Sequence, residues 1–366
     1  MSITPRKAGV VLLGESKPTP DHELAVQRNL AQRIATLLGT RFLDDDGEGE
    51  ANLYYLPSQT LIADPRYAAM GIRHESDFFG GLVSQPFMAT KAISHALFPQ
   101  ASAPQGWNDD FARQAGDALL GGFTVFNLAD AQAAATHLLK QAPLRLKPVR
   151  ATAGRGQTII RDRDELDLVL SHMDEQEILT WGLVLEENLT EVSTYSVGQV
   201  CVAGIVASYH GTQQLTEDHS GALVYGGSDL VVVRGDYAQL LQLELDDATR
   251  LAVEQAQRYE HAAQACFPGF IASRRNYDIA RGRNHLGQLR SGVLEQSWRV
   301  GGASSAEVLA LEAFAANPAL TCVRASTHEV FGDVQVPADA TLFYQGDDRE
   351  VGSISKFARI RAYEHS

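Results

Sequence analysis

Cysteine is scarce in this sequence, and its distribution excludes two kinds of protein. The 366 residues contain three cysteines, Cys201, Cys266 and Cys322. Thiols so few and so widely spaced form neither a disulfide framework nor a set of zinc ligands. We expect them to be small buried hydrophobic side chains in a reducing compartment, which predicts a cytoplasmic protein.

Long apolar runs and an excess of positive charge are also missing. The apolar run at residues 8–13 is too short for a signal sequence or a bilayer span, so no membrane partner is expected. Lysine and arginine number 31 against 45 aspartates and glutamates, which gives a formal net charge of −14. A protein that holds nucleic acid through its phosphates needs a positive face, so no nucleic-acid partner is expected either.

The composition is that of a compact globular protein, with 45% hydrophobic and 21% charged residues. This length is enough for two or three domains. Strand-like runs and helical patterns together predict an α/β (α+β) fold that begins with a small α/β unit. No Gly-x-Gly-x-x-Gly follows the first strand, which disfavours a Rossmann dehydrogenase. Strands are predicted at 10–13, 53–56, 144–149, 158–160, 183–185, 194–197 and 200–208, with 269–272 paired to 292–294; helices are predicted at 22–38, 129–141, 164–171 and 246–266.

A lysine at the end of a predicted strand is followed by a loop of small residues. Lys147 precedes the loop 151–157, which contains Gly154, Arg155 and Gly156. Small side chains let backbone N–H groups approach phosphate oxygens, and the lysine adds a point charge. A strand follows this loop, and the Gly-Lys-Ser/Thr of a P-loop is absent. The pattern predicts a phosphate-binding hairpin, although a plain glycine turn between two strands would also produce it.

A second pattern is a buried strand that runs into adjacent acidic residues. Residues 183–185 are apolar and are followed by Glu186, Glu187 and, two positions further, Leu189. Such a strand end suits a hinge whose backbone recognises the edge of a purine. A strand that ends in solvated acids is the alternative.

A third pattern places two carboxylates on neighbouring strand-like segments. Asp278 and Glu295 flank the hairpin-like stretch 281–291. Carboxylate oxygens so placed are ligands that Mg²⁺ takes together with phosphates, and Mn²⁺ accepts the same ligands. Arg299 follows Glu295 by four residues, and its guanidinium can pair with phosphate oxygens. A salt-bridged surface hairpin is the alternative.

The order of these three patterns resembles the ATP-grasp superfamily over roughly residues 87–302. A lysine with a small-residue loop comes first, then the hinge, then the paired acids with an arginine. The resemblance implies an ATP-grasp fold with a pre-ATP-grasp domain over 1–86. It further implies a small subdomain with the phosphate loop and hinge over 87–190, and a subdomain with the metal site and a C-terminal extension over 191–366.

The resemblance also implies roles for individual residues. Segment 90–97 would be a helix whose Lys91 contacts ATP, and Lys147 would be the second ATP lysine. Ser297 stands where the family has asparagine, which leaves open whether one metal ion binds or two. The implied catalytic residues are Lys147 and Arg299, the further nucleotide contacts are Gly154, Arg155, Gly156, Glu186, Glu187 and Leu189, and the metal ligands are Asp278, Glu295 and Ser297.

The implied activity is that of a ligase that uses ATP and Mg²⁺. ATP-grasp ligases activate a carboxylate as an acylphosphate, which an amine or a thiol then attacks. The expected partners are therefore a small-molecule carboxylate and a nucleophilic acceptor. An arginine-rich stretch is a candidate for holding the acid; its members are Arg274, Arg275, Arg281, Arg283 and Arg290.

Two other functions and one structural question stay open. A non-catalytic ATP-binding regulator on the same fold would account for Ser297, and a biotin-carboxylase-like activity on bicarbonate is a second alternative. The strand-like segments 341–344 and 357–360 could complete the sheet or form a homodimer contact.

Overall fold

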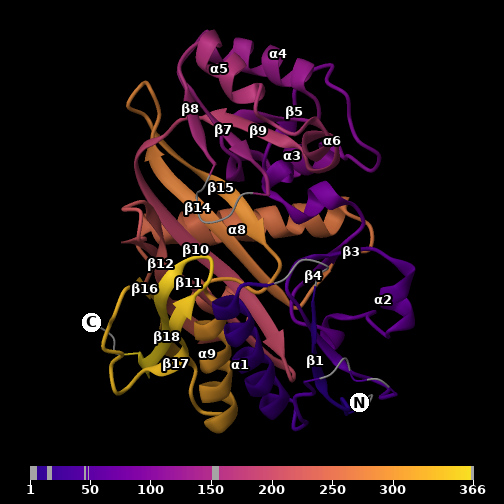
Figure 1. Cartoon of the computed structure of the whole chain (residues 1–366), viewed down its shortest axis with the longest axis vertical. Coiled ribbons are helices and arrows are strands. Elements are labelled where there is room, and N and C mark those ends of the chain that lie inside the picture. Colours follow the sequence, from indigo (N-terminus) through magenta and orange to yellow (C-terminus); the bar gives the residue numbers. More distant parts are fainter. Residues whose placement is uncertain (1–5, 15–18, 45–46, 48, 151–155, 364–366) are drawn as a thin grey trace.

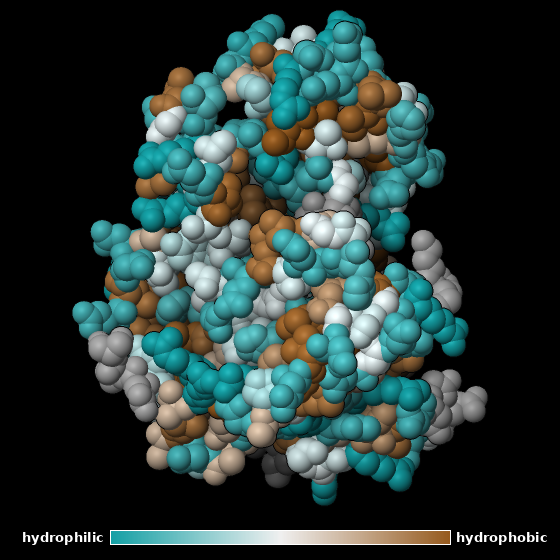
Figure 2. All heavy atoms as spheres, turned by 60° about the vertical axis from the view of Figure 1, so that its left-hand side comes forward, coloured by the Kyte–Doolittle hydropathy of each residue, from teal (hydrophilic) through white to brown (hydrophobic). Residues whose placement is uncertain are grey.

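The computed structural model describes residues 6–14, 19–44, 47, 49–150 and 156–363, whose strands form four β-sheets. The predicted α/β class is confirmed. A five-stranded sheet with its helices forms the upper part of the molecule, and an eight-stranded sheet runs through the middle (Figure 1). The surface is hollowed where the upper part meets the rest, and apolar residues lie in the hollow (Figure 2). Within the described ranges, no helix has both the length and the apolar character needed to cross a bilayer.

The N-terminal unit begins with two parallel strands that a long helix connects. β1 (Val10–Leu13) pairs with β2 (Tyr54–Pro57), and α1 (Asp21–Leu37) lies between them in the chain. Two acidic residues in the first turn of α1 favour its start because they complement the helix dipole. The strand predicted at 10–13 and the helix predicted at 22–38 are therefore confirmed.

A three-stranded sheet joins the N-terminal unit to a distant part of the chain. Its order is β13-β4-β3, formed by β13 (Ile271–Ala272), β4 (Gly81–Val83) and β3 (Leu61–Ile62). The predicted pairing of 269–272 with 292–294 is wrong, because β13 pairs with β4 instead. The sheet combines strands from the first and the third of the predicted domains, whose boundaries stay a prediction.

The backbone of β4 lies directly against the residue that precedes Arg299. The Gly81 N–H donates to the Trp298 carbonyl over 2.7 Å. A Cβ atom on Gly81 would lie 2.6 Å from the Trp298 Cβ, so only glycine allows this approach. The short elements of the unit are α2 (Pro65–Ala69) and η1 (Glu75–Asp77).

The upper part is a five-stranded sheet in the order β5-β6-β9-β7-β8. The predicted hairpin is confirmed, since β7 and β8 pair antiparallel. The helices predicted at 129–141 and 164–171 are also confirmed, and they pack on this sheet to bury an apolar core. The strands are β5 (Ala96–Leu97), β6 (Gly122–Val125), β7 (Leu144–Pro148), β8 (Thr158–Ile160) and β9 (Leu183–Glu187); the helices are α3 (Asp109–Ala115), η4 (Gly116–Ala118), α4 (Leu128–Leu139), α5 (Arg163–Leu170) and α6 (Glu175–Trp181).

The helix predicted at 90–97 is wrong. The 3-10 turn η2 (Pro86–Ala89) precedes the segment, which itself forms a second 3-10 turn, η3 (Lys91–Ser94), and then enters β5. Thr90 and His95 both have extended backbones, and the Thr90 hydroxyl accepts from the Ala92 N–H. Threonine used in this way caps a new turn and prevents a continuous helix.

The eight-stranded sheet has the order β15-β14-β10-β11-β12-β16-β18-β17. The helix predicted at 246–266 is confirmed as α8, which packs on one face of the sheet, while α9 packs on the other. The strands predicted at 341–344 and 357–360 complete this sheet. Its elements are β10 (Thr190–Val202), β11 (Ile205–Glu217), β12 (Leu223–Arg234), α7 (Tyr237–Leu240), α8 (Asp247–Cys266), β14 (Arg274–Arg283), β15 (Leu289–Ser297), α9 (Ser304–Ala316), β16 (Cys322–Phe331), β17 (Thr341–Asp348) and β18 (Gly352–Ala362).

One predicted strand, at 200–208, contains a chain reversal. Ala203 and Gly204 have φ values of 53° and 75° and form the turn between β10 and β11. Two consecutive positive φ values are typical of the two-residue turn that matches the twist of paired strands. The predicted strands 194–197 and 200–208 are corrected to the two long strands on either side of this turn.

A buried ion pair fastens α9 to the sheet. The guanidinium of Arg274, on β14, lies 2.8 Å from a carboxylate oxygen of Glu307, on α9, and both side chains are almost fully buried. The Tyr209 hydroxyl, on β11, donates to the same carboxylate over 2.5 Å. Charges removed from water in this way need a partner, so α9 is held in one position on the sheet.

We predict that Glu307→Gln destabilises the protein by about 3–5 kcal/mol, because it leaves the Arg274 charge buried without a counter-ion. Urea unfolding followed by circular dichroism measures the free energy of unfolding. Glu312→Gln is the matched control on the same helix, since its pair with Arg33 is only about three-quarters buried; its loss should be at most about 1 kcal/mol. Equal losses in the two variants would contradict a special contribution from the buried pair.

Candidate active site

Two lysines far apart in the sequence lie together beneath the upper part of the molecule. Lys91, in η3, places its Nζ 2.5 Å from Glu295 Oε2 on β15. Lys147, near the end of β7, pairs with Glu186 on β9, and His95 Nε2 lies 3.0 Å from the other oxygen of Glu186. The fields of Lys91 and Glu295 both act on Lys147. The structure therefore brings Lys91 into contact with one of the predicted metal ligands and Lys147 within electrostatic range of it.

Burial and ion pairing have opposite effects on the pKa values of Lys147 and Glu186. Burial lowers the pKa of Lys147, and the Glu186 carboxylate opposes that change. Burial alone would raise the pKa of Glu186, but Lys147 and His95 outweigh it and hold the pKa at about 2. Glu186 thus stays ionised at neutral pH and compensates the buried ammonium of Lys147.

The two predicted metal carboxylates face each other across the β14–β15 hairpin. Asp278 and Glu295 are register partners, and a bulge follows directly after Asp278. The Gln213 amide, from β11, donates to Asp278 Oδ1 over 2.7 Å. Burial raises the pKa of Asp278 to about 7, and the Glu295 carboxylate adds to the rise. Burial would also raise the pKa of Glu295, but Lys91 holds it below its usual value.

Strand β15 ends at Ser297, which stands where the ATP-grasp family has asparagine, and Arg299 follows two residues later. Arg299 Nη1 donates to the Val300 carbonyl over 2.9 Å, and burial lowers the pKa of Arg299 while Glu295 opposes this. Ser297 shares a sheet face with Glu295, because residues two apart on a strand point the same way. Its Oγ accepts from Arg274 Nη1 over 3.2 Å. A guanidinium at this distance opposes a cation at the Ser297 hydroxyl.

These residues fit one divalent cation. Two carboxylates side by side, one with a raised pKa, repel each other, and a cation between them relieves that repulsion. Among the residues that the structure describes, no three His, Cys, Asp or Glu side chains converge as metal ligands. A cation held by Asp278 and Glu295 would therefore take further oxygens from phosphates and water, as Mg²⁺ commonly does.

A comparison with protein-family models identifies the family of this chain. A family model described as "Protein of unknown function (DUF3182)" matches residues 10–358. The chain belongs to the DUF3182 family. A comparison with curated proteins finds no match.

The DUF3182 chain is also similar to solved structures of ATP-grasp ligases. Phosphoribosylamine–glycine ligase from Thermotoga maritima matches with a TM-score of 0.52 at 12% identity, over 98% of this chain and 93% of that chain. A RimK domain ATP-grasp protein from Sphaerobacter thermophilus matches with a TM-score of 0.41 at 13% identity, over 85% of this chain and 98% of that chain. The ATP-grasp fold predicted from the sequence is confirmed. At this identity the likeness concerns the fold and does not assign a substrate.

The remaining predicted nucleotide contacts differ in their surroundings. In this DUF3182 member the Glu187 carboxylate accepts from the Gly121 N–H and pairs with Arg290. Leu189 is buried in a small apolar cluster with Leu120, Ala280 and Leu294, beside the strands that carry the acids. Gly156 has a φ of 70°. Gly154 and Arg155 lie outside the described residues. All of these nucleotide contacts stay predictions.

Most of the arginine-rich stretch forms ion pairs with glutamates of the chain. Arg274 pairs with Glu307, and Arg275 lies 3.1 Å from Glu260. Arg283 pairs with Glu191 and Arg290 with Glu187, while Arg281 has a half-buried side chain on β14. Four of the five candidates for holding the acid are thus engaged by glutamates of the chain.

Sequence reasoning missed three groups that shape the site. His95 supports Glu186, Gln213 supports Asp278, and the Arg274–Glu307 pair holds the strand end at Ser297. Each partner lies on another element of the fold. His95 stands within the segment quoted for the ATP helix, but no local pattern marks it as the partner of an acid.

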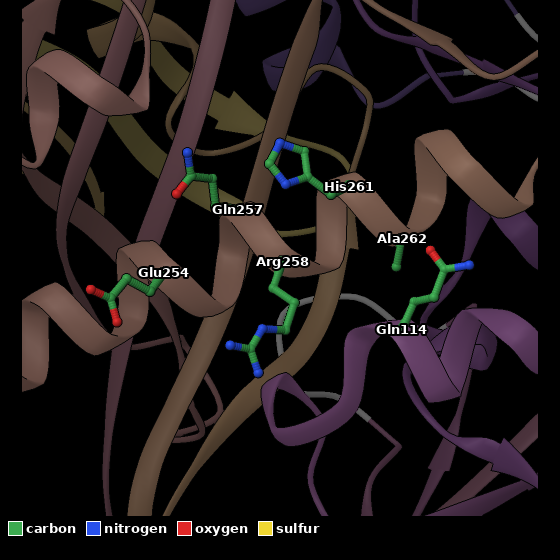
Figure 3. A pocket seen from close by; sticks show the side chains of 6 residues that line it. All are labelled: Gln114, Glu254, Gln257, Arg258, His261 and Ala262. Atoms are coloured by element: carbon green, nitrogen blue, oxygen red, sulfur yellow. The ribbon is translucent and has the colours of Figure 1, made fainter.

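Two hollows in the described residues differ in their relation to these groups. The first, of about 340 Å³, lies between α3 and the outer side of α8, and its lining includes Gln114, Arg258 and His261 (Figure 3). It contains no predicted site residue. The second is a cavity of about 230 Å³ whose lining includes Arg299. The second hollow is therefore the one connected to the candidate active site.

We predict that the free energy of unfolding falls less on acidification in Glu186→Gln than in the wild type. Because the folded pKa of Glu186 is about 2, its stabilising effect is complete above about pH 4.5 and is lost as the pH falls toward 2. The full effect is on the order of 3 kcal/mol. Urea unfolding measures this free energy at about pH 5 and about pH 3, and the decrease between the two pH values should be smaller in the variant than in the wild type.

Glu187→Gln is the control for this experiment. It alters the neighbouring carboxylate but keeps Glu186 with Lys147 and His95, so the wild-type difference between the two pH values should persist. A Glu186→Gln variant that loses as much stability as the wild type would show that Glu186 is not the titrating group.

Proposed function

We propose that this protein is an ATP- and Mg²⁺-dependent ligase that activates a carboxylate as an acylphosphate for attack by an amine or a thiol. The observation that carries the proposal is the placement of Asp278 and Glu295 opposite each other, with Lys91 against Glu295 and Lys147 close by. Paired carboxylates suit a divalent metal ion, and nearby lysines suit the phosphates that such an ion would bridge.

The roles follow from charge and position. Lys91, Lys147 and Arg299 would contact the phosphates, while Asp278 and Glu295 would hold Mg²⁺. The metal would neutralise charge on the transferred phosphoryl group. Positioning and electrostatic stabilisation dominate such a transfer, which accounts for a site built from charged side chains. The apolar cluster around Leu189 offers a surface on which the base of the nucleotide would pack.

The chemistry balances with ATP as the co-reactant. A carboxylate oxygen of the acid attacks the γ-phosphorus, the bond from that phosphorus to the β–γ bridging oxygen breaks, and ADP leaves with the electron pair. The amine or thiol then attacks the acyl carbon, inorganic phosphate leaves, and the proton of the acceptor passes to water. Arg299, beside Glu295, is placed to stabilise charge on the transferred group.

A regulator that binds ATP without catalysis is the second candidate. The hydrogen bond from Arg274 to Ser297 favours it, because it ties up the hydroxyl at the position where the family has a metal-binding asparagine. Nucleotide binding is common to both candidates, whereas formation of an acylphosphate belongs to the ligase alone.

We predict micromolar, metal-dependent binding of a non-hydrolysable ATP analogue, on the order of −8 kcal/mol, in calorimetric titration. Asp278→Asn/Glu295→Gln should weaken it at least tenfold, because the phosphates lose their metal bridge. Asp247→Asn/Glu254→Gln, on the exposed side of α8, is the control that removes the same charge elsewhere and should bind as the wild type does. Absence of binding to the wild type with Mg²⁺ present would refute the proposed function.

Hydroxylamine provides a test for the acylphosphate. It is a nitrogen nucleophile that converts acylphosphates into hydroxamates, which are measured by their colour with iron. We predict ATP-dependent hydroxamate formation from at least one small carboxylate, and a loss of about a hundredfold in Arg299→Lys, which keeps the charge but not the planar fork. Tight analogue binding without any hydroxamate would favour the regulator.

A further inference from the structure

The cavity beside Arg299 lies where three parts of the fold meet. α1 and the turn after β2 form one side, the start of α9 forms another, and β16 with β18 forms the third. Its volume of about 230 Å³ suits a molecule with few heavy atoms rather than a peptide or a drug-sized ligand. The polar and charged side chains around it include Glu23, Gln27, Ser58, Arg299, Glu329 and Lys356.

One hydroxyl in the cavity wall is buried without a partner. Ser58 is 9% exposed, and its Oγ has no hydrogen-bond partner in the described part of the chain. A buried hydroxyl that bonds to nothing costs free energy of about 1–3 kcal/mol. The cost is recovered when a ligand in the cavity supplies the missing hydrogen bond.

The start of α9 forms an adjoining part of the wall. Within the described part of the chain no side chain caps this helix, and Gly301, Gly302 and Ser305 line the cavity there. A Cβ on Gly302 would lie 2.4 Å from the ring of Tyr225, so the backbone at this turn must be glycine. Uncapped N–H groups and the positive end of a helix favour a carboxylate.

Arg299 connects the cavity to the carboxylates of the site. It lines the cavity, and the charges that act on it are those of Glu295, Arg274, Glu23 and Asp278. An acid whose carboxylate lies at Arg299 would therefore be next to the phosphates in the proposed function.

The cavity wall also carries negative charge. Glu23, on α1, has a half-exposed side chain, and Glu329, on β16, pairs with Lys356 on β18 over 3.0 Å. A plain carboxylate would gain nothing from Glu23, whereas a molecule with an ammonium group would form a charge-assisted hydrogen bond. The two charge signs around so small a volume match a zwitterion.

We propose that this cavity binds the acid substrate and that this acid is a small amino acid. Its carboxylate faces Arg299 and the start of α9, its ammonium faces Glu23, and Ser58 supplies a further hydrogen bond. This inference rests on the proposed function, because it takes the carboxylate at Arg299 to be the one that ATP activates.

Binding of free amino acids tests the proposal. The protein is saturated with Mg²⁺ and the ATP analogue, and each common amino acid, in both enantiomeric forms, is titrated calorimetrically beside acetate, propionate, succinate and glutarate. We expect at least one amino acid to bind and the acids without an amino group to bind at least tenfold more weakly. If no amino acid binds, or if the plain acids bind as well, the inference is wrong.

Two variants locate the binding in the cavity. Glu23→Gln should weaken the amino acid about tenfold, because the ammonium loses its ionic partner, while Glu312→Gln, outside the cavity, should leave it unchanged. Ser58→Ala should also weaken it about tenfold without lowering the urea midpoint, because the hydroxyl bonds to none of the described residues and so has no such partner to lose. Unchanged amino-acid affinity in both variants would overturn the assignment.

The ATP analogue separates this inference from the proposed function. Analogue affinity should stay within about twofold of the wild type in Glu23→Gln and Ser58→Ala, since neither residue belongs to the nucleotide site. Analogue binding without amino-acid binding refutes the inference alone. A wild-type protein that binds no analogue refutes the proposed function, and the inference with it.

Discussion

The ion pair between Lys91 and Glu295 determines how the two largest sheets are placed. Lys91 is 6% exposed and belongs to the segment that leads into the five-stranded sheet, whereas Glu295 belongs to the eight-stranded sheet. An ammonium removed from water must have a counter-ion, so the upper part can sit only where its lysines reach a carboxylate. The Lys147–Glu186–His95 cluster satisfies the same requirement within the upper part. The site is thus assembled by the need to pair buried charges.

The sequence predicts those parts of the fold in which a local pattern coincides with a strand or helix end. The β7–β8 hairpin follows from a lysine, a loop of small residues and a returning apolar run. The β14–β15 hairpin follows from two strand-like segments that carry Asp278 and Glu295 on either side of the hairpin-like stretch 281–291, and the structure makes these two acids register partners. Alternation along strands and the order of the motifs are local properties, which is why the sequence carries them.

Other features depend on partners that lie far away in the chain. The ATP-grasp resemblance implies a helix over segment 90–97, but the Thr90 hydroxyl caps a new turn and His95 lies against Glu186. Nothing near Ser58 or Arg274 indicates that one hydroxyl is left unpaired and one guanidinium is fully buried against Glu307. Such properties arise from packing between elements, and a single sequence does not specify which glutamate meets which arginine.

The contact between Gly81 and Trp298 makes the N-terminal unit part of the framework of the candidate active site. The unit donates a hydrogen bond to the residue directly before Arg299, through a glycine that no other residue can replace without moving the strand end. It also supplies Glu23 and Ser58 to the cavity. The unit is therefore not an interchangeable module: a chimaera that takes this unit from another protein of the same fold would need a glycine that matches Trp298, or Arg299 would be displaced from the cavity that it lines.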